Sequence, residues 1–330
     1  MPCEFEVDVL IGGNRYQYGF ALNKSQIIEE WLFAYPNGKH QIWFERRNGT
    51  EGWHFGFALK GEKRKLTQLT RDDVLFLSVA GKFNPQLTPL YDWFAHFLQI
   101  VEPDTQQQDF LEFVTAWQQP EQQRLFEQLI TLLSQADMGI VDVKVEMQPL
   151  QDEIPTGLPA GVKTALENLA TVVNQLHPKQ MATVPQPFFV HQTVSGRYAL
   201  PLLDESAGTR RLFVLGWLVL QALQKGGVLI IDELDSSLHP ILAREIVQIF
   251  QNPILNSQNA QLLFNTHDIT LLDTTLMRRD QIWFVEKDRA GISRLYSLLV
   301  YSPRKDESLV KGYLQGRYGA IPMVDGFYGE

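Results

Sequence analysis

The chain has 330 residues, 45% of them apolar, which is enough for one large or two modest domains and excludes wholesale disorder. Its formal net charge of −9, from 29 basic and 38 acidic residues, makes the surface a poor non-specific binder of DNA. Cys3 is the only cysteine, which excludes an internal disulfide or a cysteine-based metal site and fits a reducing cytosol. The amino terminus has no signal-peptide pattern, and residues 212–223, the longest apolar run, are too short to span a bilayer.

Residues 4–60 have the alternation that is typical of an antiparallel sheet. Apolar and acidic side chains alternate along residues 4–9, Gly12 and Gly13 give a hairpin turn signal, and the alternation resumes along residues 16–20. We predict a meander whose aromatic side chains form core or cross-strand pairs. Its further strands are predicted at residues 26–35, 41–45 and 53–59.

Residues 71–135 have helical character, including the stretch 90–101. Pro120 is expected to separate two helices, and glutamines give the second helix a polar outer face. Too few heptads follow one another for a long coiled-coil arm, so we predict a helical lobe or a short arm. The apolar face of the second helix carries leucines at positions i, i+4, i+7 and i+8, namely Leu125, Leu129, Leu132 and Leu133.

Residues 140–202 combine strands with a linker. The alternation over residues 140–147 predicts an exposed strand. Prolines and a glycine make residues 148–160 a loop or linker, and residues 162–176 are predicted to form an amphipathic helix. Two more strands are predicted at residues 188–192 and 198–202.

A helix is predicted to begin at Ser206. This serine is a good N-cap residue, Gly208 leaves room for a close backbone approach, and the apolar stretch 212–223 follows. The start of a helix directs free N–H groups and the positive end of the helix dipole outward, which suits an anion. An ordinary capped helix has the same pattern, and for this segment alone that interpretation is favoured.

Residues 228–231 form an unbroken apolar strand that ends in two carboxylates, Asp232 and Glu233. A strand without alternation is predicted to be buried on both faces, as in the parallel sheets of α/β proteins. Ligands of such sheets bind at the carboxyl ends of the strands, so both acids lie where a nucleotide would bind. There, the first acid can hold Mg²⁺ and the second can polarise an attacking water. For the dipeptide alone, a plain strand end that caps the next helix has equal support.

A second apolar strand, residues 261–264, leads to His267. We expect this histidine at the same sheet edge as Asp232 and Glu233, where an imidazole can sense or orient a terminal phosphate. An ordinary loop histidine is the alternative, and the order of the three segments along the chain weakens it. A parallel sheet with helices on its faces is indicated by the alternation of strands and helices. Its remaining elements are predicted at residues 240–250 (helix), 281–286 and 293–299 (strands).

Together these segments resemble a known family. The chain is similar to the AAA-type ATP/GTPases of the OLD- and SMC-like branch of ABC-type ATPases, many of which are encoded in bacterial defence operons. The resemblance is strong over residues 185–325 and weaker over residues 1–150. It is carried by matches to the signature, Walker B, D-loop and switch-histidine motifs at residues 206–209, 229–233, 238–240 and 265–268.

The resemblance implies an α/β fold with an ABC-type, P-loop NTPase-like ATPase core, an antiparallel β-subdomain and a helical insertion. We expect the β-subdomain at residues 1–70. The helical lobe with its linker is expected at residues 71–180, and the carboxyl-terminal half of the ATPase, with the signature, Walker B, D-loop and switch histidine, at residues 181–330.

The resemblance also implies transfer of the γ-phosphoryl group of ATP to water, with Mg²⁺ as cofactor. Asp232 would help to hold Mg²⁺, Glu233 would orient or deprotonate the water, and His267 would contact the γ-phosphate. Arg210 and Arg211 would serve phosphate or interface roles, or form a solvated helix start. The residues that would face the nucleotide of a second subunit in a head-to-tail dimer are Ser206, Gly208 and Thr209 of the signature and Asp235, Ser236 and Ser237 of the D-loop.

The P-loop of this family, Gly-x-x-x-x-Gly-Lys-Ser/Thr, does not occur in the sequence. Residues 60–65 are the nearest basic segment with a glycine, and they lack the second glycine and the Ser/Thr, so we predict a charged turn. Strand alternation is already under way at residues 4–9, where the family would have its first strand, P-loop and first helix upstream. We therefore expect that Met1 is an internal start, or that another polypeptide supplies the P-loop.

Two functions stay open on these grounds. The first is ATP binding and hydrolysis by a cytoplasmic motor or switch of a bacterial defence or toxin system, working as a homodimer or higher homo-oligomer with an effector protein from a neighbouring gene. The second is a non-catalytic dimerisation or adaptor subunit that cannot bind ATP alone. Intact Asp232, Glu233 and His267 favour the first, and the missing P-loop favours the second. Neither nucleic acid nor a membrane is indicated as a partner.

Overall fold

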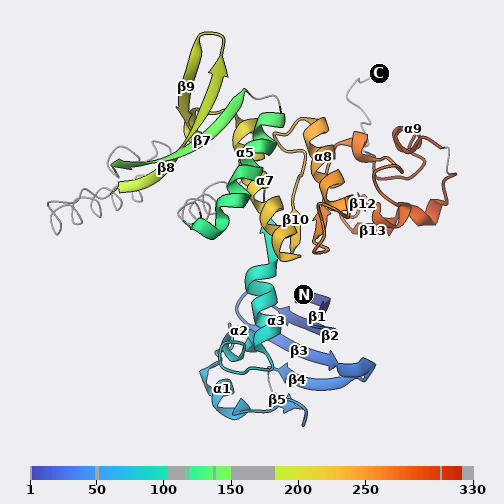
Figure 1. The fold of residues 1–330 in the computed structure, drawn as a ribbon. Coiled ribbons are helices and arrows are strands. Elements are labelled where there is room, and N and C mark those ends of the chain that lie inside the picture. Colours follow the sequence, from blue (N-terminus) through green and yellow to red (C-terminus); the bar gives the residue numbers. More distant parts are fainter. Residues whose placement is uncertain are drawn as a thin grey trace. The chain divides into compact units, whose positions relative to one another are not determined.

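The chain divides into two compact units, which are called unit 1 (Met1–Leu98) and unit 2 (Gln99–Glu330), each with its own core (Figure 1). The predicted helix at residues 162–176 lies outside the described residues, as does most of the predicted linker at residues 148–160. The predicted domain boundaries at residues 70 and 180 stay predictions. The computed structural model describes residues 2–48, 52–102, 116, 119–136, 139–149, 183–304 and 307–321.

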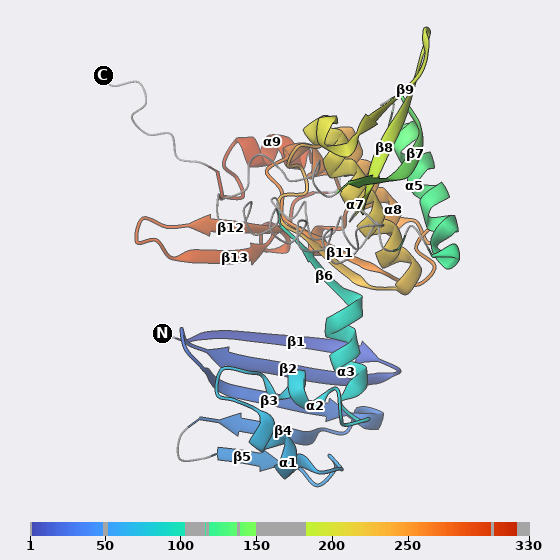
Figure 2. The same cartoon turned by 90° about the vertical axis from the view of Figure 1, so that its left-hand side faces the viewer.

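Unit 1 contains a five-stranded antiparallel sheet in the order β1-β2-β3-β4-β5 (Figure 2). The predicted hairpin turn is confirmed, since Gly12 and Gly13 have φ of 56° and 79° and connect the paired ends of β1 and β2. The last strand is shorter than predicted and ends at Phe55. Leu59 is buried, but it lies in the loop that follows this strand. The strands are β1 Cys3–Ile11, β2 Asn14–Leu22, β3 Ile27–Tyr35, β4 Gln41–Arg47 and β5 Gly52–Phe55.

Short helices complete the core of unit 1. The predicted role of the aromatic residues is confirmed, because Tyr16 and Trp43 are buried with their rings edge to face at 5.5 Å, and Phe44 packs on Phe76 of α2 at 5.0 Å. The prediction of a charged turn over residues 60–65 is wrong from Lys63 onward, where α1 begins. The helices are α1 Lys63–Leu69, α2 Phe76–Ala80 and α3 Thr88–Asp92, which continues as a π-helical turn, Trp93–Phe97.

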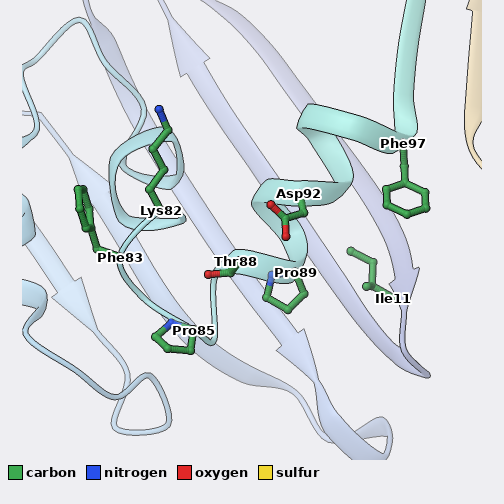
Figure 3. A pocket seen from close by; sticks show the side chains of 8 residues that line it. All are labelled: Ile11, Lys82, Phe83, Pro85, Thr88, Pro89, Asp92 and Phe97. Atoms are coloured by element: carbon green, nitrogen blue, oxygen red, sulfur yellow. The ribbon is translucent and has the colours of Figure 1, made fainter. Parts of the chain in front are cut away.

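An open hollow lies on unit 1 beside α3 (Figure 3). It contains none of the residues that the sequence predicts for a nucleotide site. Its lining is mostly apolar, with one basic and one acidic side chain: Ile11, Lys82, Phe83, Pro85, Thr88, Pro89, Asp92 and Phe97.

The core of unit 2 contains a three-stranded sheet in the order β11-β10-β6. Strands β10 (Val228–Ile231) and β11 (Gln261–Phe264) are parallel, as predicted. The prediction of a helix over residues 90–101 is wrong at its end. Residues Leu98–Val101 form β6 because their backbone is hydrogen-bonded to β10 and the residue after it. For example, the N–H of Asp232 donates to the carbonyl of Val101 at 2.8 Å.

The prediction that β10 is buried on both faces is wrong. Leu229 and Ile231 are buried in the core that contains α7 (Ala207–Lys225), whereas Val228 and Ile230 on the other face are only half-buried. The unbroken apolar sequence therefore gives an alternating burial pattern. Helix α8, Pro240–Gln251, follows β10 and also packs into this core through Ala243, Ile246 and Val247.

Helix α7 is the central helix of unit 2. It ends at Gly226, whose φ of 70° is the left-handed conformation that glycine adopts at helix ends. The predicted leucine face is confirmed in helix α5 (Gln123–Gln135), which packs on α7, with the rings of Phe126 and Trp217 stacked at 4.9 Å. Leu125, Leu129 and Leu133 are buried, and Leu132 is half-buried.

Two antiparallel sheets and a short helix complete the described part of unit 2. One sheet has the order β7-β8-β9, and the other is the pair β12–β13. The prediction that the last two strands join the parallel sheet is wrong, since they pair only with each other among the described residues. Figure 1 shows both sheets. The bounds are β7 Ile140–Pro149, β8 Thr183–Thr193, β9 Gly196–Pro201, β12 Trp283–Lys287, β13 Ser293–Ser297 and α9 Leu309–Leu314.

The α/β fold class that the sequence predicts is confirmed, with an antiparallel sheet in unit 1 and parallel strands with helices in unit 2. In the part of the chain that is described, no helix combines the length and the apolar character needed to cross a bilayer.

Candidate functional site

The carboxyl ends of β10 and β11 bring two of the predicted motifs together. Ile231 and Phe264 are paired in register, so the residues that follow them are neighbours. The side-chain Nδ2 of Asn265 donates a hydrogen bond to Oδ1 of Asp232 at 2.5 Å. The side-chain Oδ1 of Asn265 accepts a hydrogen bond from the backbone N–H of Glu233 at 2.7 Å. One asparagine side chain therefore contacts both members of the acidic pair.

Glu233 has a backbone conformation that is unusual for a residue with a side chain. Its φ is 53°, in the left-handed region. Such a conformation costs about 1–3 kcal/mol and persists only where surrounding contacts determine it. Here Asn265 holds the backbone of Glu233 and of the next residue. The side chain of Asn265 accepts a hydrogen bond from the N–H of Glu233, and the backbone carbonyl of Asn265 accepts one from the N–H of Leu234 at 3.1 Å. Glu233 is half-buried and Asp232 is exposed.

Asp235 connects the predicted D-loop to the predicted switch segment. Its Oδ1 accepts hydrogen bonds from Oγ1 of Thr266 at 2.6 Å and from the backbone N–H of His267 at 3.2 Å. Ser236 belongs to the same turn, because its N–H donates to the carbonyl of Glu233 at 2.9 Å. The carboxylate of Asp235 thus holds the segment after β11 against the segment after β10 within one chain, in addition to any role at an interface.

His267 lies at the predicted sheet edge with an exposed side chain. Its backbone is fixed by Asp235, and its imidazole makes no hydrogen bond or ion pair with another described residue. The structure therefore brings the histidine segment to the acidic pair, and contact of this imidazole with a phosphate stays a prediction.

The predicted start of α7 is confirmed. Ser206 is the N-cap, and its Oγ accepts from the N–H of Thr209 at 3.1 Å and lies 2.8 Å from the Thr209 hydroxyl. Thr209 is buried, and its hydroxyl is hydrogen-bonded to Ser206. A Cβ atom built on Gly208 would lie 3.1 Å from the carbonyl oxygen of Ser237. The predicted signature segment and the predicted D-loop are therefore in direct contact within the chain.

Arg211 has a different place from those expected. It is 2% exposed, and its guanidinium donates to the backbone carbonyls of Glu102 (3.2 Å) and Asp232 (3.5 Å). It therefore connects α7 to the chain beyond β6 and β10, and a solvated helix start is wrong for this residue. Arg210 is half-buried and donates to the carbonyl of Glu205 at 2.8 Å. This difference could not be predicted from the sequence, since the two arginines are adjacent.

The segment before Ser206 contains a buried pair that the sequence did not predict. Nε2 of His191, on β8, lies 2.5 Å from Oε1 of Glu205, and both side chains are largely buried. The ring of His191 stacks on Tyr198 of β9 at 5.1 Å. The pair connects the β7-β8-β9 sheet to the residue that precedes the N-cap of α7.

The acidic pair suits a magnesium ion that also binds phosphate. The described residues contain no group of three or more His, Cys, Asp or Glu side chains placed to hold a metal ion. Mg²⁺ at nucleotide sites needs only one or two carboxylates, because phosphate oxygens and water provide its other ligands. Asp232 meets this need, since it is exposed and its Oδ2 makes no hydrogen bond with a described residue.

The comparison of the sequence with family models identifies the family of the chain. The model described as "AAA domain, putative AbiEii toxin, Type IV TA system" matches residues 1–273. The chain belongs to this AAA family. The resemblance to AAA-type ATPases is therefore confirmed at the level of the AAA family.

Comparisons with solved structures give neighbours at low identity and low TM-score. An Smc head bound to the C-winged helix domain of ScpA is 12% identical, with 86% of this chain and 74% of that chain covered and a TM-score of 0.33. An Smc head with an extended coiled coil, bound to the C-terminal domain of ScpA from Pyrococcus furiosus, is 12% identical, with coverages of 86% and 77% and a TM-score of 0.32. RecF with ATP is 12% identical, with coverages of 77% and 75% and a TM-score of 0.25. A comparison with curated proteins gives no match, so the family assignment rests on the family model.

Proposed function

We propose that this chain supplies the Walker B, signature and switch side of an ATP-hydrolysing site. The hydrogen-bonded arrangement of Asp232, Glu233 and Asn265 at adjacent ends of parallel strands carries the proposal. The carboxylate of Asp232 would help to hold Mg²⁺, and that of Glu233 would orient or deprotonate the attacking water. Phosphoryl transfer depends mainly on such positioning and on charge stabilisation. When bound, Mg²⁺ would neutralise charge on the phosphate oxygens.

The start of α7 and the D-loop would bind the nucleotide of a second copy in a homodimer. Ser206 and Ser237 are exposed, and the contact between Gly208 and the Ser237 carbonyl places the two segments together. The first N–H groups of a 19-residue helix, with its positive dipole end, suit phosphate oxygens. Thr209, Asp235 and Ser236 would support these segments and complete the interface.

The P-loop would reach the site on a polypeptide segment that the 330-residue sequence does not contain. The core sheet supports this, because its face opposite α7 is apolar and open among the described residues. Ile230 is half-buried there, and Ile100 and Leu263 are 62% and 51% exposed. Further elements of an ATPase core could pack on this face.

The test is ATP binding and turnover with Mg²⁺, measured for the purified chain alone and for the chain co-expressed with a P-loop-bearing segment. That segment is sought in the coding sequence upstream of Met1 and in the neighbouring genes. Turnover that appears only in the combined protein supports the proposal. A combined protein that assembles and binds no ATP contradicts it, and supports the alternative of a non-catalytic dimerisation or adaptor subunit.

We also propose a role as the motor or switch of a bacterial toxin or defence system, in the cytoplasm and with an effector protein from a neighbouring gene. The description of the matching family as an AbiEii-type toxin domain supports this role. Expression of the complete operon in a bacterial host should reduce phage plaque formation or arrest growth, and Glu233→Gln should remove the effect. Equal plaque numbers and growth with and without the operon would contradict the role and leave the proposed ATPase activity intact.

A further inference from the structure

We infer that Asn265 is a positioning residue for the proposed ATP hydrolysis, and that it sets both the orientation of the Asp232 carboxylate and the backbone conformation of Glu233. The inference rests on the proposed function, because it assigns to Asn265 the geometry on which the two acids would depend.

The chemistry of the asparagine side chain fits this position. The carboxylate of Asp232 can only accept hydrogen bonds when it is ionised, and the backbone N–H of Glu233 can only donate one. An amide has an N–H₂ donor and a C=O acceptor on the same carbon, so one side chain satisfies both groups, at 2.5 Å and 2.7 Å. The reversed amide orientation would satisfy neither group. Aspartate would lose the donor, and leucine would lose both hydrogen bonds.

The contact to Glu233 matters because of its left-handed conformation. With φ at 53°, this residue depends on its surroundings to keep its carboxylate in place. The backbone of Asn265 would remain after substitution, since its N–H donates to Ile231 at 3.3 Å and its carbonyl accepts from Leu234 at 3.1 Å. Loss of the side chain therefore releases the N–H of Glu233 and leaves the neighbouring backbone hydrogen bonds intact.

The contact to Asp232 fixes one of its two carboxylate oxygens. With Oδ1 held by Asn265, rotation of the carboxylate is restricted, and Oδ2, which makes no hydrogen bond with a described residue, stays available to a phosphate-bound Mg²⁺. Groups that orient a metal ligand typically change metal affinity or activity by about 10- to 100-fold when they are removed. Asn265 has this relation to Asp232.

The test compares Asn265→Leu, which is similar in size and lacks both hydrogen-bonding groups, with Gln261→Leu at the exposed start of β11, the strand that ends just before Asn265. Amide hydrogen exchange in the full chain, without nucleotide, should become faster at Glu233 and stay unchanged at Leu234. In the combined protein with ATP, binding of Mn²⁺ followed by electron paramagnetic resonance should weaken by about 10- to 100-fold, and kcat should fall within the same range. The KM for ATP should stay unchanged, and Gln261→Leu should resemble the wild type in every measurement.

A second variant, Asn265→Asp, separates the two contacts. It keeps an oxygen that accepts from the N–H of Glu233 and loses the donor to Asp232, so exchange at Glu233 should stay slow while kcat falls. Unchanged exchange at Glu233 in Asn265→Leu, or wild-type Mn²⁺ binding and kcat in that variant, would overturn the inference. If the wild-type combined protein lacks ATPase activity, the proposed function fails, whereas an active wild type with an equally active Asn265→Leu overturns only the role of Asn265.

Discussion

The carboxylate of Glu30 in unit 1 is fully buried, whereas that of Asp232 in unit 2 is exposed at the end of a strand. Glu30 accepts hydrogen bonds from the hydroxyl of Tyr18 (2.9 Å) and from the backbone N–H groups of Phe76 (2.6 Å) and Leu77 (3.0 Å). These partners join the sheet of unit 1 to the first turn of α2. The carboxylate of Asp232 accepts a hydrogen bond from a single described side chain, that of Asn265.

The difference shows two uses of a polar group. In unit 1 the polar groups are buried and paired within the fold. Burial raises the pKa of Glu30 above its ordinary value and raises the pKa of Tyr18 well above its ordinary value. In unit 2 the polar groups are held in place and left accessible to a ligand. Changes in unit 1 should therefore act on stability, and changes at the end of β10 should act on turnover.

The largest effect is expected for Glu233→Gln in the combined, ATP-hydrolysing protein. The amide cannot take a proton from water, and loss of a general base typically lowers kcat by about 10²- to 10⁴-fold. ATP binding should be retained, since the charge of Asp232 and the phosphate contacts remain. Steady-state turnover and equilibrium binding of labelled ATP measure the two quantities.

Glu245→Gln on the exposed face of α8 is the matched control, because Glu245 is solvent-exposed and outside the site. It should leave turnover unchanged. If Glu233→Gln hydrolyses ATP as fast as this control, Glu233 has no part in the reaction and the proposed contrast between the units is lost.

In unit 1 the largest effect is expected for Arg46→Met. The guanidinium is 2% exposed, lies 3.8 Å from Glu30, and donates to the carbonyls of Val74 (2.6 Å) and Arg71 (3.1 Å). Its removal leaves the Glu30 charge without this compensation, and breaking a buried pair in this way costs about 3–5 kcal/mol. Urea unfolding should show this loss in the free energy of unfolding.

Lys65→Met is the matched control on α1, since its ion pair with Glu62 is more than 70% exposed on both sides. Exposed pairs contribute about 1 kcal/mol or less. Equal losses for the two variants would show that the buried network of unit 1 contributes no more than a surface pair.

A smaller, pH-dependent effect should follow from Glu30. Burial is the main cause of its raised pKa, and the hydrogen bonds from Leu77, Phe76 and Tyr18 and the charge of Arg46 oppose it. The folded protein therefore binds this proton more tightly than the unfolded chain. The stabilisation is complete below the unfolded pKa of about 4.3 and is lost as the pH rises through the higher folded pKa, by about 1.4 kcal/mol for each pH unit between the two values.

Urea unfolding between about pH 4 and about pH 7 checks this linkage, because the Glu side chain titrates from about 4.3 upward. Glu30→Gln should flatten the decline in the free energy of unfolding, and Glu62→Gln, at an exposed position, should leave it unchanged. A decline of the same size in Glu30→Gln would assign the pH dependence to other groups.

Local features of the fold could be predicted from the sequence because their causes are local. The N-cap at Ser206, the turn at Gly12 and Gly13 and the leucine face of α5 each depend on residues within a few positions of one another. Strand β6 could not be predicted in this way. Residues 98–101 follow a helix directly and become a strand through pairing with β10, which lies about 130 residues further along the chain.

The candidate site was predictable as a set of segments and not as a set of contacts. The acids and His267 were expected at one sheet edge from the order of the strands. The bridge from Asn265 to Asp232 spans 33 positions, and the pair His191–Glu205 depends on how β8 packs beside the start of α7. Such contacts depend on side-chain direction in the folded chain, which hydrophobic periodicity does not determine.

The smallest effect on stability is expected for Ser206→Ala, and its position makes it the sharpest test of the contrast between fold and site. Loss of the N-cap hydroxyl, which accepts from the N–H of Thr209, should lower the free energy of unfolding by about 1 kcal/mol. Ser308→Ala at the start of α9 removes a similar N-cap hydrogen bond, which Ser308 accepts from the N–H of Lys311. It should lower the free energy of unfolding by a similar amount and have no effect on turnover.

Ser206→Asp then separates capping from nucleotide binding. Aspartate is an equally good N-cap, and its charge favours the helix dipole, so stability should equal that of the wild type or exceed it. The same carboxylate would repel the phosphates of an ATP bound at this helix start, so turnover in the combined protein should be lost. Normal turnover in Ser206→Asp would show that the start of α7 faces no nucleotide, and that in this part of unit 2, as in unit 1, the polar groups serve the fold alone.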